Sequence, residues 1–339
     1  MSGNSEGDSG ARLLLLDDGR PGHWRQVSAL AAQLDLSARR IELRLLPPWR
    51  WLAPRRLPLG LAVHGALRRS LPVEPPRAVI SCGRRSALVL RWLADYWPER
   101  PLTVQILHCG IDPRHFDWLI TPRHDAVSAP NVIRTLGSLN PVDEKWLSCT
   151  PEDPVRTGPE PHVVLLLGGR SRHFDLSPAW LEEHLAPLAG TVHRAGGSLE
   201  AVASPRTPGW ARDEFTKLTV PPVRRFTGWR ADETGAGSYR AALSRATHFV
   251  VTADSVNLLS EACATGRPVC VLGAERVRGR IADFVRTLLA DGYAHPAEEL
   301  AGVLAGQRAC RRLRETPAVA VRLRRSGGLG QGTHAGLEN

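Results

Sequence analysis

Residues 252–272 of the chain read TADSVNLLSEACATGRPVCVL, and the order of residue types in this stretch decides the fold class. The run HFVVT, which ends at Thr252, is mostly β-branched or aromatic and too short for a helix, so it predicts a buried strand. Asp254 or Ser255 can cap the following helix, and the Gly-Arg-Pro at 266–268 ends that helix before a second apolar run, VCVL. A strand, a helix and another strand form a βαβ unit, which is the building block of a parallel sheet.

The same unit carries polar residues where a ligand would bind. Ser255 and Asn257 lie at the predicted helix N-terminus, where unpaired N–H groups and the helix dipole favour an anion. Glu261 shares a helix face with Asn257 and offers a carboxylate to sugar hydroxyls. The pattern fits the diphosphate and ribose of a nucleotide sugar, although an ordinary capped βαβ unit explains this segment equally well.

Apolar runs and helical patterns alternate outward from this unit over all 339 residues, a length that favours two domains. The predicted strands are 12–16, 78–81, 104–107, 118–121 and, as a weaker candidate, 132–135 in the first half, then 162–167, 199–204, 248–252 and 269–272. The predicted helices are 26–34, 86–97, 178–189, 238–244, 256–265 and 281–290. We therefore predict an α/β protein with two facing, doubly wound Rossmann-like domains and a ligand cleft between them.

Composition also predicts the domain boundaries. The segment 151–161 is rich in proline and acidic residues and is the predicted linker between an N-terminal domain, 11–150, and a C-terminal domain, 162–325. The polar start, 1–10, and the Gly-rich end, 326–339, are predicted to be disordered tails. The arginine-rich stretch 311–325 is expected to be helical in part.

Charge restricts the classes of partner. The formal net charge is +10 and the pI about 10.1, a balance that favours anionic partners such as nucleotides or phospholipid headgroups. Lysine occurs only at Lys145 and Lys217, so the excess is almost all arginine, and a compositional bias of the genome explains it as well. Aromatic residues are not interleaved with basic ones and no nucleic-acid-binding motif is present, so nucleic acid is not an expected partner.

The sequence favours a cytoplasmic protein without a metal. No apolar run approaches the ~20 residues that span a bilayer, and the acidic, Gly/Ser-rich start does not resemble a signal peptide. The six cysteines show no paired spacing and are interpreted as reduced thiols. The adjacent His108 and Cys109 have poor ligand spacing and no Asp-x-Asp follows a strand, so no metal ion and no other cofactor is expected.

Polar residues and glycines follow four consecutive predicted strands of the first half. The first such loop, DDGRPGH, ends at His23, which could serve as a general base on an acceptor hydroxyl, with Asp18 as its catalytic companion. A histidine that only stabilises the turn is the competing interpretation. The candidates for acceptor binding on these loops are Gly19, Arg20, Gly22, Gln26, Arg84, Arg123 and His124.

Loops of the second half suit phosphate contact. A Gly-Gly turn follows the strand 162–167, and backbone N–H groups and arginines close to it can bind a diphosphate. The loop has neither the Lys-Ser/Thr ending of a Walker A motif nor the GxGxxG spacing. The candidates for nucleotide-sugar binding are Gly168, Gly169, Arg170, Ser171, Arg172, Arg206, Asp254, Ser255, Asn257 and Glu261.

These motifs together resemble a known family. The runs DGRPGH from Asp18, TPRHD from Thr121, LGGRSR from Leu167, SPRTP from Ser204 and TADSVN from Thr252 look like those of the bacterial relatives of the plant mitochondrial-fission factor named for elongated mitochondria. The resemblance implies a glycosyltransferase-B-type fold, with the first loop serving an acceptor and the last βαβ unit holding a UDP-sugar. On that resemblance Glu261 would bind the ribose, and Ser255 and Asn257 would face the diphosphate.

The segment 47–72 mixes Trp49 and Trp51 with leucines and several arginines, a composition that suits contact with anionic lipid at a membrane surface. Packing on the N-terminal sheet is the alternative.

The sequence thus favours a metal-independent glycosyltransferase that transfers a sugar from a nucleotide-diphosphate donor to an envelope or lipid-linked acceptor, with the protein cytoplasmic and peripheral on the inner face of the membrane. A non-catalytic adaptor of the same family and a sugar-nucleotide epimerase or hydrolase are the alternatives, since fold alone does not decide function.

Overall fold

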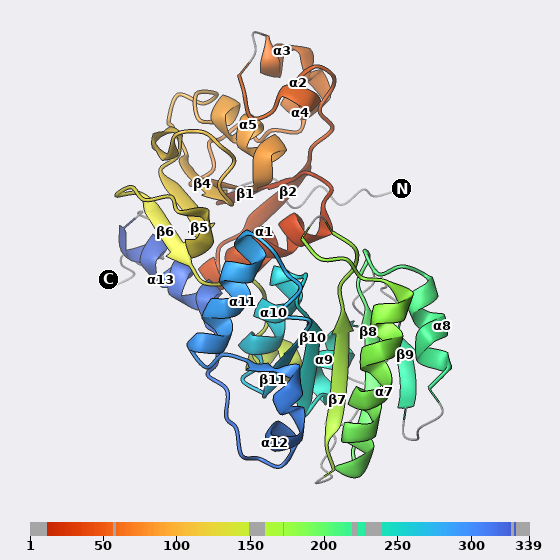
Figure 1. Ribbon diagram of the computed structural model, residues 1–339. Coiled ribbons are helices and arrows are strands. Elements are labelled where there is room, and N and C mark those ends of the chain that lie inside the picture. The colour runs from red at the N-terminus through yellow and green to blue at the C-terminus, as the bar shows by residue number, and fades with distance from the viewer. Residues whose placement is uncertain are drawn as a thin grey trace, which may run out of the picture. The chain divides into compact units, whose positions relative to one another are not determined.

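The chain forms two compact units, each built on one sheet (Figure 1). The computed structural model describes residues 12–56, 59–148, 160–171, 173–218, 223–227, 239–326 and 329. Unit 1 comprises Met1–Pro141 and Glu315–Asn339, and unit 2 comprises Val142–Arg314.

The sheet of unit 1 has six parallel strands in the order β2-β1-β3-β4-β5-β6. The strands are β1 (Leu13–Asp17), β2 (Ala38–Glu42), β3 (Ala78–Cys82), β4 (Leu102–Ile106), β5 (Trp118–Pro122) and β6 (Val132–Thr135). The chain runs from β1 to β2 in one direction and returns across β1 to β3, so the strand order reverses between β1 and β3.

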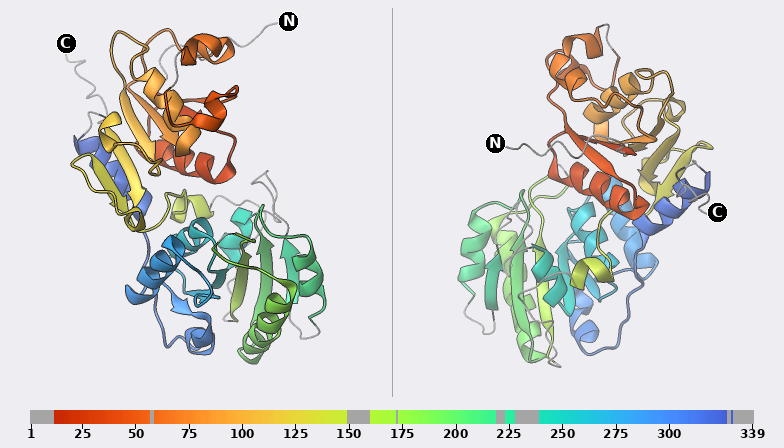
Figure 2. Two further views of the ribbon diagram at one scale, coloured as in Figure 1. Left: turned by 45° about the horizontal axis from the view of Figure 1, so that its top comes forward. Right: turned by 180° about the vertical axis from the view of Figure 1, so that it is seen from behind.

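Helices cover both faces of this sheet (Figure 2). On one face α1 (Pro21–Leu34) packs beside α13 (Glu315–Ser326). On the other lies α5 (Gly83–Leu93), together with the short helices α2 (Trp49–Leu52), α3 (Gly60–Val63) and α4 (Gly65–Arg69). Because both faces are covered, every residue of β1 is buried, which explains its uninterrupted run of leucines.

The sheet of unit 2 also has six parallel strands, in the order β12-β11-β10-β7-β8-β9. They are β7 (His162–Leu167), β8 (Ser198–Ala203), β9 (Val223–Thr227), β10 (His248–Thr252), β11 (Val269–Leu272) and β12 (His295–Pro296). Here the strand order reverses between β7 and β10.

The helices of unit 2 are α6 (Glu144–Ser148), α7 (Pro178–Arg194), α8 (Trp210–Thr216), α9 (Tyr239–Arg245), α10 (Val256–Ala264), α11 (Arg280–Ala290) and α12 (Leu300–Leu304). α7 and α8 pack together on one face of the sheet, and α9 and α10 contact its strands from the other (Figures 1 and 2). Short 3₁₀ turns occur at η1 (Pro113–His115), η2 (Arg123–Asp125) and η3 (Ala297–Glu299).

The predicted fold class, two Rossmann-like α/β domains, is confirmed, and most elements lie where the sequence placed them. The bounds of β6, β7, β10 and β11 are those predicted. Three helices differ by several residues, since α1 begins at Pro21 and not at residue 26, α5 is Gly83–Leu93 and not 86–97, and α7 continues to Arg194 and not to residue 189. Three strands were missed, namely β2, β9 and β12.

The C-terminal helix corrects the predicted domain division. The sequence placed residues up to 325 in the second domain, but α13 belongs to unit 1. Val319, Ala320 and Leu323 are buried against α1, because they cover the face of the first sheet that α1 leaves open. The division between units also falls at Pro141, ahead of α6, and not at residue 150.

The predicted linker and tails lie mostly outside the described residues. Of the 151–161 linker, the structure describes residues 160 and 161, and of the 326–339 tail it describes Ser326 and Leu329. Leu329 is buried in the core cluster that also contains residues of α1 and α13, so this position is packed, contrary to the prediction of disorder. Among the described residues no helix combines the length and apolar character needed to cross a bilayer.

Candidate functional site

Each unit brings polar side chains together at the point where its strand order reverses. Loops that follow the two strands at such a switch point diverge to opposite faces of the sheet, which leaves room for a ligand at their carboxyl ends. In unit 1 these are the loops after β1 and β3, and in unit 2 the loops after β7 and β10.

A carboxylate and a histidine meet at the switch point of unit 1. Asp18 follows β1 and His23 lies in the first turn of α1, and His23 Nδ1 is 3.1 and 3.0 Å from the two carboxylate oxygens of Asp18. The Asp18 side chain is 1% exposed, whereas His23 is 18% exposed. The backbone N–H of Arg20 also donates to Asp18, at 3.2 Å. The two catalytic candidates are therefore brought into direct contact.

The neighbouring strand makes room for the histidine ring. A Cβ atom on Gly83, the residue after β3, would lie 2.4 Å from His23 Cε1. Gly83 also has φ +83°, a conformation that favours glycine. The loop after β3 thus holds the ring against Asp18, and sequence reasoning missed this role, although Gly83 lies in a strand-end motif.

The electrostatics of the pair keep the carboxylate ionised. Burial raises the pKa of Asp18, but the hydrogen bond and charge of His23, with smaller contributions from Arg20, outweigh it and leave the pKa below its ordinary value. An ionised aspartate on Nδ1 selects the tautomer with the proton on Nδ1. That tautomer leaves Nε2 as the nitrogen that can accept a proton.

A pocket of about 250 Å³ adjoins the same aspartate. It is lined by Asp18, Leu43, Arg44, Leu45, Arg50 and Arg85. The sequence did not single out Arg44 and Arg85 for the site, although Arg85 directly follows a strand-end glycine and arginine.

The other acceptor-binding candidates are spread over several positions in unit 1. Gln26 is buried and donates to the carbonyl of Gly22 within α1, and Arg84 donates to the carbonyl of Ala53 at 2.8 Å. Gly19, with φ +78°, donates its N–H to Asp17. Arg123 and His124 form η2 after β5, and β3 and β4 separate β5 from β1. Three strand spacings amount to about 14 Å, so these two residues do not join the Asp18–His23 pair.

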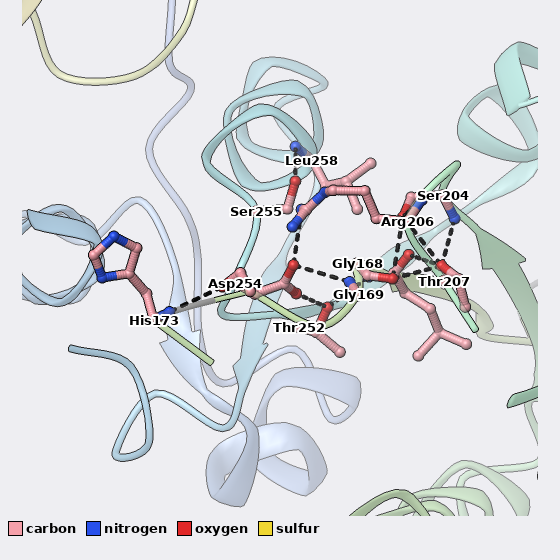
Figure 3. Close-up of polar contacts among 12 residues, drawn as sticks. Gly168, Gly169, His173, Ser204, Arg206, Thr207, Thr252, Asp254, Ser255 and Leu258 are labelled. Atoms are coloured by element: carbon pink, nitrogen blue, oxygen red, sulfur yellow. Dashed lines mark hydrogen bonds and ion pairs between the residues drawn. The ribbon is translucent and has the colours of Figure 1, made fainter. Parts of the chain in front are cut away.

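At the switch point of unit 2 a buried carboxylate organises the loops (Figure 3). Asp254, whose side chain is fully buried, accepts hydrogen bonds from Gly169 N at 3.0 Å, Arg206 Nη2 at 2.8 Å and Thr252 Oγ1 at 2.7 Å. Thr252 in turn accepts from Gly168 N at 2.8 Å. Arg206 is 45% exposed, so Asp254 fixes one end of a guanidinium that also reaches solvent.

The two glycines of the predicted phosphate loop have a packing reason. A Cβ atom on Gly168 would lie 2.0 Å from Asp254 Oδ1, and one on Gly169 would lie 2.0 Å from the carbonyl oxygen of Arg206. The carbonyl of Gly168 also accepts from Thr207 and Ser204 in the loop after β8. Close packing of three loops therefore requires glycine at both positions, whether or not a ligand binds there.

The remaining nucleotide-sugar candidates occupy separate positions. Ser255 caps α10 by accepting from Leu258 N, and the partly exposed Asn257 lies in the first turn of that helix. Arg170 is exposed and pairs with Asp175 at 3.5 Å, and the Ser171 hydroxyl accepts from His173 N. Arg172 lies outside the described residues.

Glu261 differs from its expected setting. It lies on α10 with 3% of its surface exposed, and its carboxylate accepts the hydroxyl of Tyr239 at 2.5 Å. The residue thus has a structural partner within unit 2, and its contact with a ribose stays a prediction.

No metal centre is visible in the part of the chain that the structure describes, where no three His, Cys, Asp or Glu side chains gather as ligands. The described cysteines, Cys82, Cys109, Cys263, Cys270 and Cys310, are free, and burial raises the pKa of Cys109 to about 11.

The fold and the two switch points define a two-domain α/β protein of the glycosyltransferase-B type. Solved structures share this architecture. The UDP-GlcNAc 2-epimerase from Neisseria meningitidis, bound to UDP-GlcNAc, has a TM-score of 0.53 and 11% identity over 93% of this chain and 98% of that chain. The glycosyltransferase SnogD from Streptomyces nogalater has a TM-score of 0.52 and 14% identity over 93% and 99%. At these identities the likeness shows the fold alone.

The chain belongs to the mitochondrial fission ELM1 family, whose family model matches residues 21–326, and the family resemblance is thereby confirmed. The mitochondrial fission protein ELM1 of Arabidopsis thaliana is 29% identical over 248 residues, which cover 65% of this chain and 57% of the plant protein, less than two thirds of its length. The Rickettsia prowazekii protein RP120 is 23% identical over 307 residues, 76% of this chain and 82% of that one.

Proposed function

We propose that the chain is a glycosyltransferase that uses a nucleotide-diphosphate sugar, with its acceptor at the switch point of unit 1 and its donor at the switch point of unit 2. The observation that carries this proposal is the Asp18–His23 pair, a buried carboxylate 3.0 Å from the Nδ1 of a partly exposed imidazole. Such a pair is the arrangement that general-base catalysis on a hydroxyl requires.

In the proposed reaction His23 Nε2 takes the proton of an acceptor hydroxyl. The acceptor oxygen forms a bond to the anomeric carbon of the donor sugar, and the bond from that carbon to the diphosphate breaks. The nucleoside diphosphate leaves with the electron pair, and Asp18 stabilises the imidazolium until the proton is released to solvent.

Three features of unit 2 support donor binding. The half-exposed Arg206 can offset leaving-group charge, and the N-terminus of the nine-residue helix α10 adds N–H groups and a dipole. Ser255 and Asn257 start that helix. Several proteins with the same fold are described as bound to UDP-GlcNAc or UDP. No divalent metal is part of the proposal, since arginine and helix dipole supply the positive charge.

An exposed apolar surface on unit 1 supports a role at a membrane. Among the described residues of the segment 46–73, the exposed large hydrophobic side chains are Leu46, Trp51, Leu52, Leu59, Val63 and Val73, and Trp51 and Leu59 are each 71% exposed. Arg55, Arg56, Arg68 and Arg69 are exposed on the same segment. Trp49, expected beside Trp51 at the lipid, is partly buried and packs edge-on against His64 at 5.3 Å, next to the core cluster.

We propose that this surface, 46–73, binds anionic lipid from the cytoplasmic side. Full-length protein should sediment with phosphatidylglycerol vesicles and not with phosphatidylcholine vesicles, and salt should weaken binding because each surface arginine contributes about 1 kcal/mol that ions screen. Replacing Trp51, Leu59 and Arg55 together should abolish binding, whereas Val321→Ala, an exposed valine on α13, should not. If equal amounts of protein sediment with both vesicle types, the proposed binding of anionic lipid is rejected.

Calorimetry of the full chain with nucleoside diphosphates and nucleotide sugars tests the donor, and release of the diphosphate in the presence of candidate acceptors tests transfer. Conversion of the sugar nucleotide without an acceptor would favour the second candidate, an epimerase or hydrolase, which the fold of the UDP-GlcNAc 2-epimerases supports. Binding of no nucleotide would favour a non-catalytic adaptor, as membership of a mitochondrial fission family suggests.

A further inference from the structure

We propose that the pocket beside Asp18 binds a phosphoryl group of the acceptor through Arg44, Arg50 and Arg85. This inference rests on the proposed function only in calling the ligand an acceptor. The anion site itself is argued from unit 1 alone.

The three arginines come from two segments of the chain, the stretch from Arg44 to Arg50 and the start of α5. Arg44 follows the edge strand β2, Arg50 lies on α2, and Arg85 lies in the first turn of α5. All three line one pocket of about 250 Å³, and Leu43 and Leu45 form its apolar wall. Convergence of these two segments, which lie far apart in the sequence, on one cavity distinguishes the cluster from a run of basic residues along a surface helix.

The protein offsets the positive charge of this pocket only in part. Among the hydrogen bonds and ion pairs of the described residues, none joins these three side chains to a carboxylate. Other arginines of unit 1 do have such partners, since Arg56 pairs with Asp95 and Arg100 with Asp117. The acid in the lining, Asp18, is already engaged by His23.

Three cations around one acidic group therefore leave an excess of positive charge in the pocket. Guanidinium groups bind phosphate through paired N–H donors, so a phosphoryl group matches the cluster in both charge and geometry. A neutral sugar or alcohol would leave the repulsion among the arginines in place.

The pocket also adjoins the catalytic pair. Asp18 both lines the pocket and holds His23, and Arg85 is two residues beyond Gly83, which contacts the His23 ring. A phosphoryl group bound by the arginines would thus hold a hydroxyl of the same molecule near His23. The leucine wall, with the exposed Leu46 and Trp51 close by in sequence, accommodates an apolar part of the acceptor.

The test measures binding of inorganic phosphate and glucose 1-phosphate to the full chain by calorimetry at low salt. We expect Arg85→Gln and Arg50→Gln each to weaken binding roughly tenfold or more, as for loss of a charge-assisted hydrogen bond. Arg114→Gln, which removes an 88% exposed arginine elsewhere on unit 1, is the matched control for net charge. Thermal unfolding of each variant verifies that the fold is intact.

Phosphate could instead bind at the switch point of unit 2, and Arg206→Gln separates the two sites. Retained phosphate binding in Arg206→Gln and loss in Arg85→Gln supports the proposal. Equal effects of Arg85→Gln and Arg114→Gln, or loss only in Arg206→Gln, would overturn it. Binding of phosphate without binding of any nucleotide would support the anion site and reject the proposed glycosyltransferase. Binding of nucleotides without binding of phosphate at this pocket would reject the anion site alone.

A second arm identifies the source of the phosphoryl group. Vesicles of phosphatidylcholine doped with phosphatidic acid present it as a lipid headgroup, and glucose 1-phosphate presents it in solution. If Arg85→Gln weakens binding of the vesicles or of glucose 1-phosphate, the result supports the site and identifies the source of the phosphoryl group. If Arg85→Gln weakens neither, the result contradicts the site.

Discussion

The switch point of unit 1 holds an aspartate that orients a partly exposed histidine, whereas the switch point of unit 2 holds an aspartate whose bonds join the surrounding loops. Asp18 uses its carboxylate on one side chain, His23, and borders an open cationic pocket. Asp254 divides its carboxylate among a backbone N–H, an arginine and a threonine. The same topological position therefore orients one side chain in unit 1 and joins several loops in unit 2.

Gly19 of unit 1 and Gly168 of unit 2 are glycines for different reasons. Gly19 of unit 1 has φ +78° with open space around its missing Cβ, so it is required by backbone conformation. Gly168 of unit 2 is required by contact, since Asp254 occupies the space of a Cβ. The comparison predicts that substitutions in unit 1 affect turnover first, and those in unit 2 affect stability first.

The largest expected effect is that of His23→Ala on turnover. Loss of general-base help should lower the rate of sugar transfer about 10²–10⁴-fold and leave donor affinity unchanged, because His23 belongs to the other unit. Initial rates and calorimetry measure the two quantities, with His115→Ala, an exposed histidine on η1, as the control. Parallel losses of rate and donor affinity would make His23 a folding or positioning residue.

Gly168→Ala should cost about 3 kcal/mol of unfolding free energy, because the new methyl group overpacks the buried Asp254 carboxylate. Gly19→Ala should cost about 1 kcal/mol, the strain of a left-handed conformation. Denaturant unfolding compares them with Gly209→Ala, which has open space and an ordinary φ. A larger loss of unfolding free energy in Gly19→Ala than in Gly168→Ala would contradict backbone conformation as the reason for Gly19 and close contact as the reason for Gly168.

Glu261→Ala should weaken nucleoside diphosphate binding by about 1–3 kcal/mol if its carboxylate reaches the ribose. Glu183→Ala, an exposed glutamate on α7, controls for the charge change. Unchanged UDP and GDP affinity together with reduced stability would assign Glu261 to its hydrogen bond with Tyr239 alone.

The smallest expected effect is an opposite pH dependence of stability in the two units. Burial raises the pKa of Glu200 in unit 2, but hydrogen bonds and charge from His162 and Arg245 lower it overall, below 4.5. Its stabilisation is therefore present above pH 4.5 and lost as the pH falls through the lowered pKa. Burial raises the pKa of Glu315 in unit 1, so its contribution is present below pH 4.5 and lost as the pH rises through the raised pKa.

Unfolding of Glu200→Gln and Glu315→Gln between acid and neutral pH measures these contributions. We expect Glu200→Gln to remove a contribution to the free energy of unfolding that rises with pH. We expect Glu315→Gln to remove a contribution that falls with pH. The difference in unfolding free energy between the wild-type protein and each variant should therefore change with pH in opposite directions. A change in the same direction for both variants would refute the pKa shifts assigned to Glu200 and Glu315.

The sequence by itself determined the central strands. The runs that form β1, β7 and β10 are covered by helices on both faces, so they carry an uninterrupted apolar signal. The missed strands β2, β9 and β12 all lie at sheet edges, where one side meets solvent. β2 reads ARRIE with Ile41 alone buried, and such a pattern does not differ from that of a loop.

The tertiary structure alone decided which side chains meet. Asp18, His23 and Asp254 were each predicted from their places at strand ends, but their partners were not, because pairing depends on strand order and loop packing across the sheet. The same holds for α13, whose apolar face does not specify which of two similar sheets it covers. Arg85 lies far along the chain from Arg44 and Arg50, and only the folding of these two segments around one pocket makes the three arginines a candidate site.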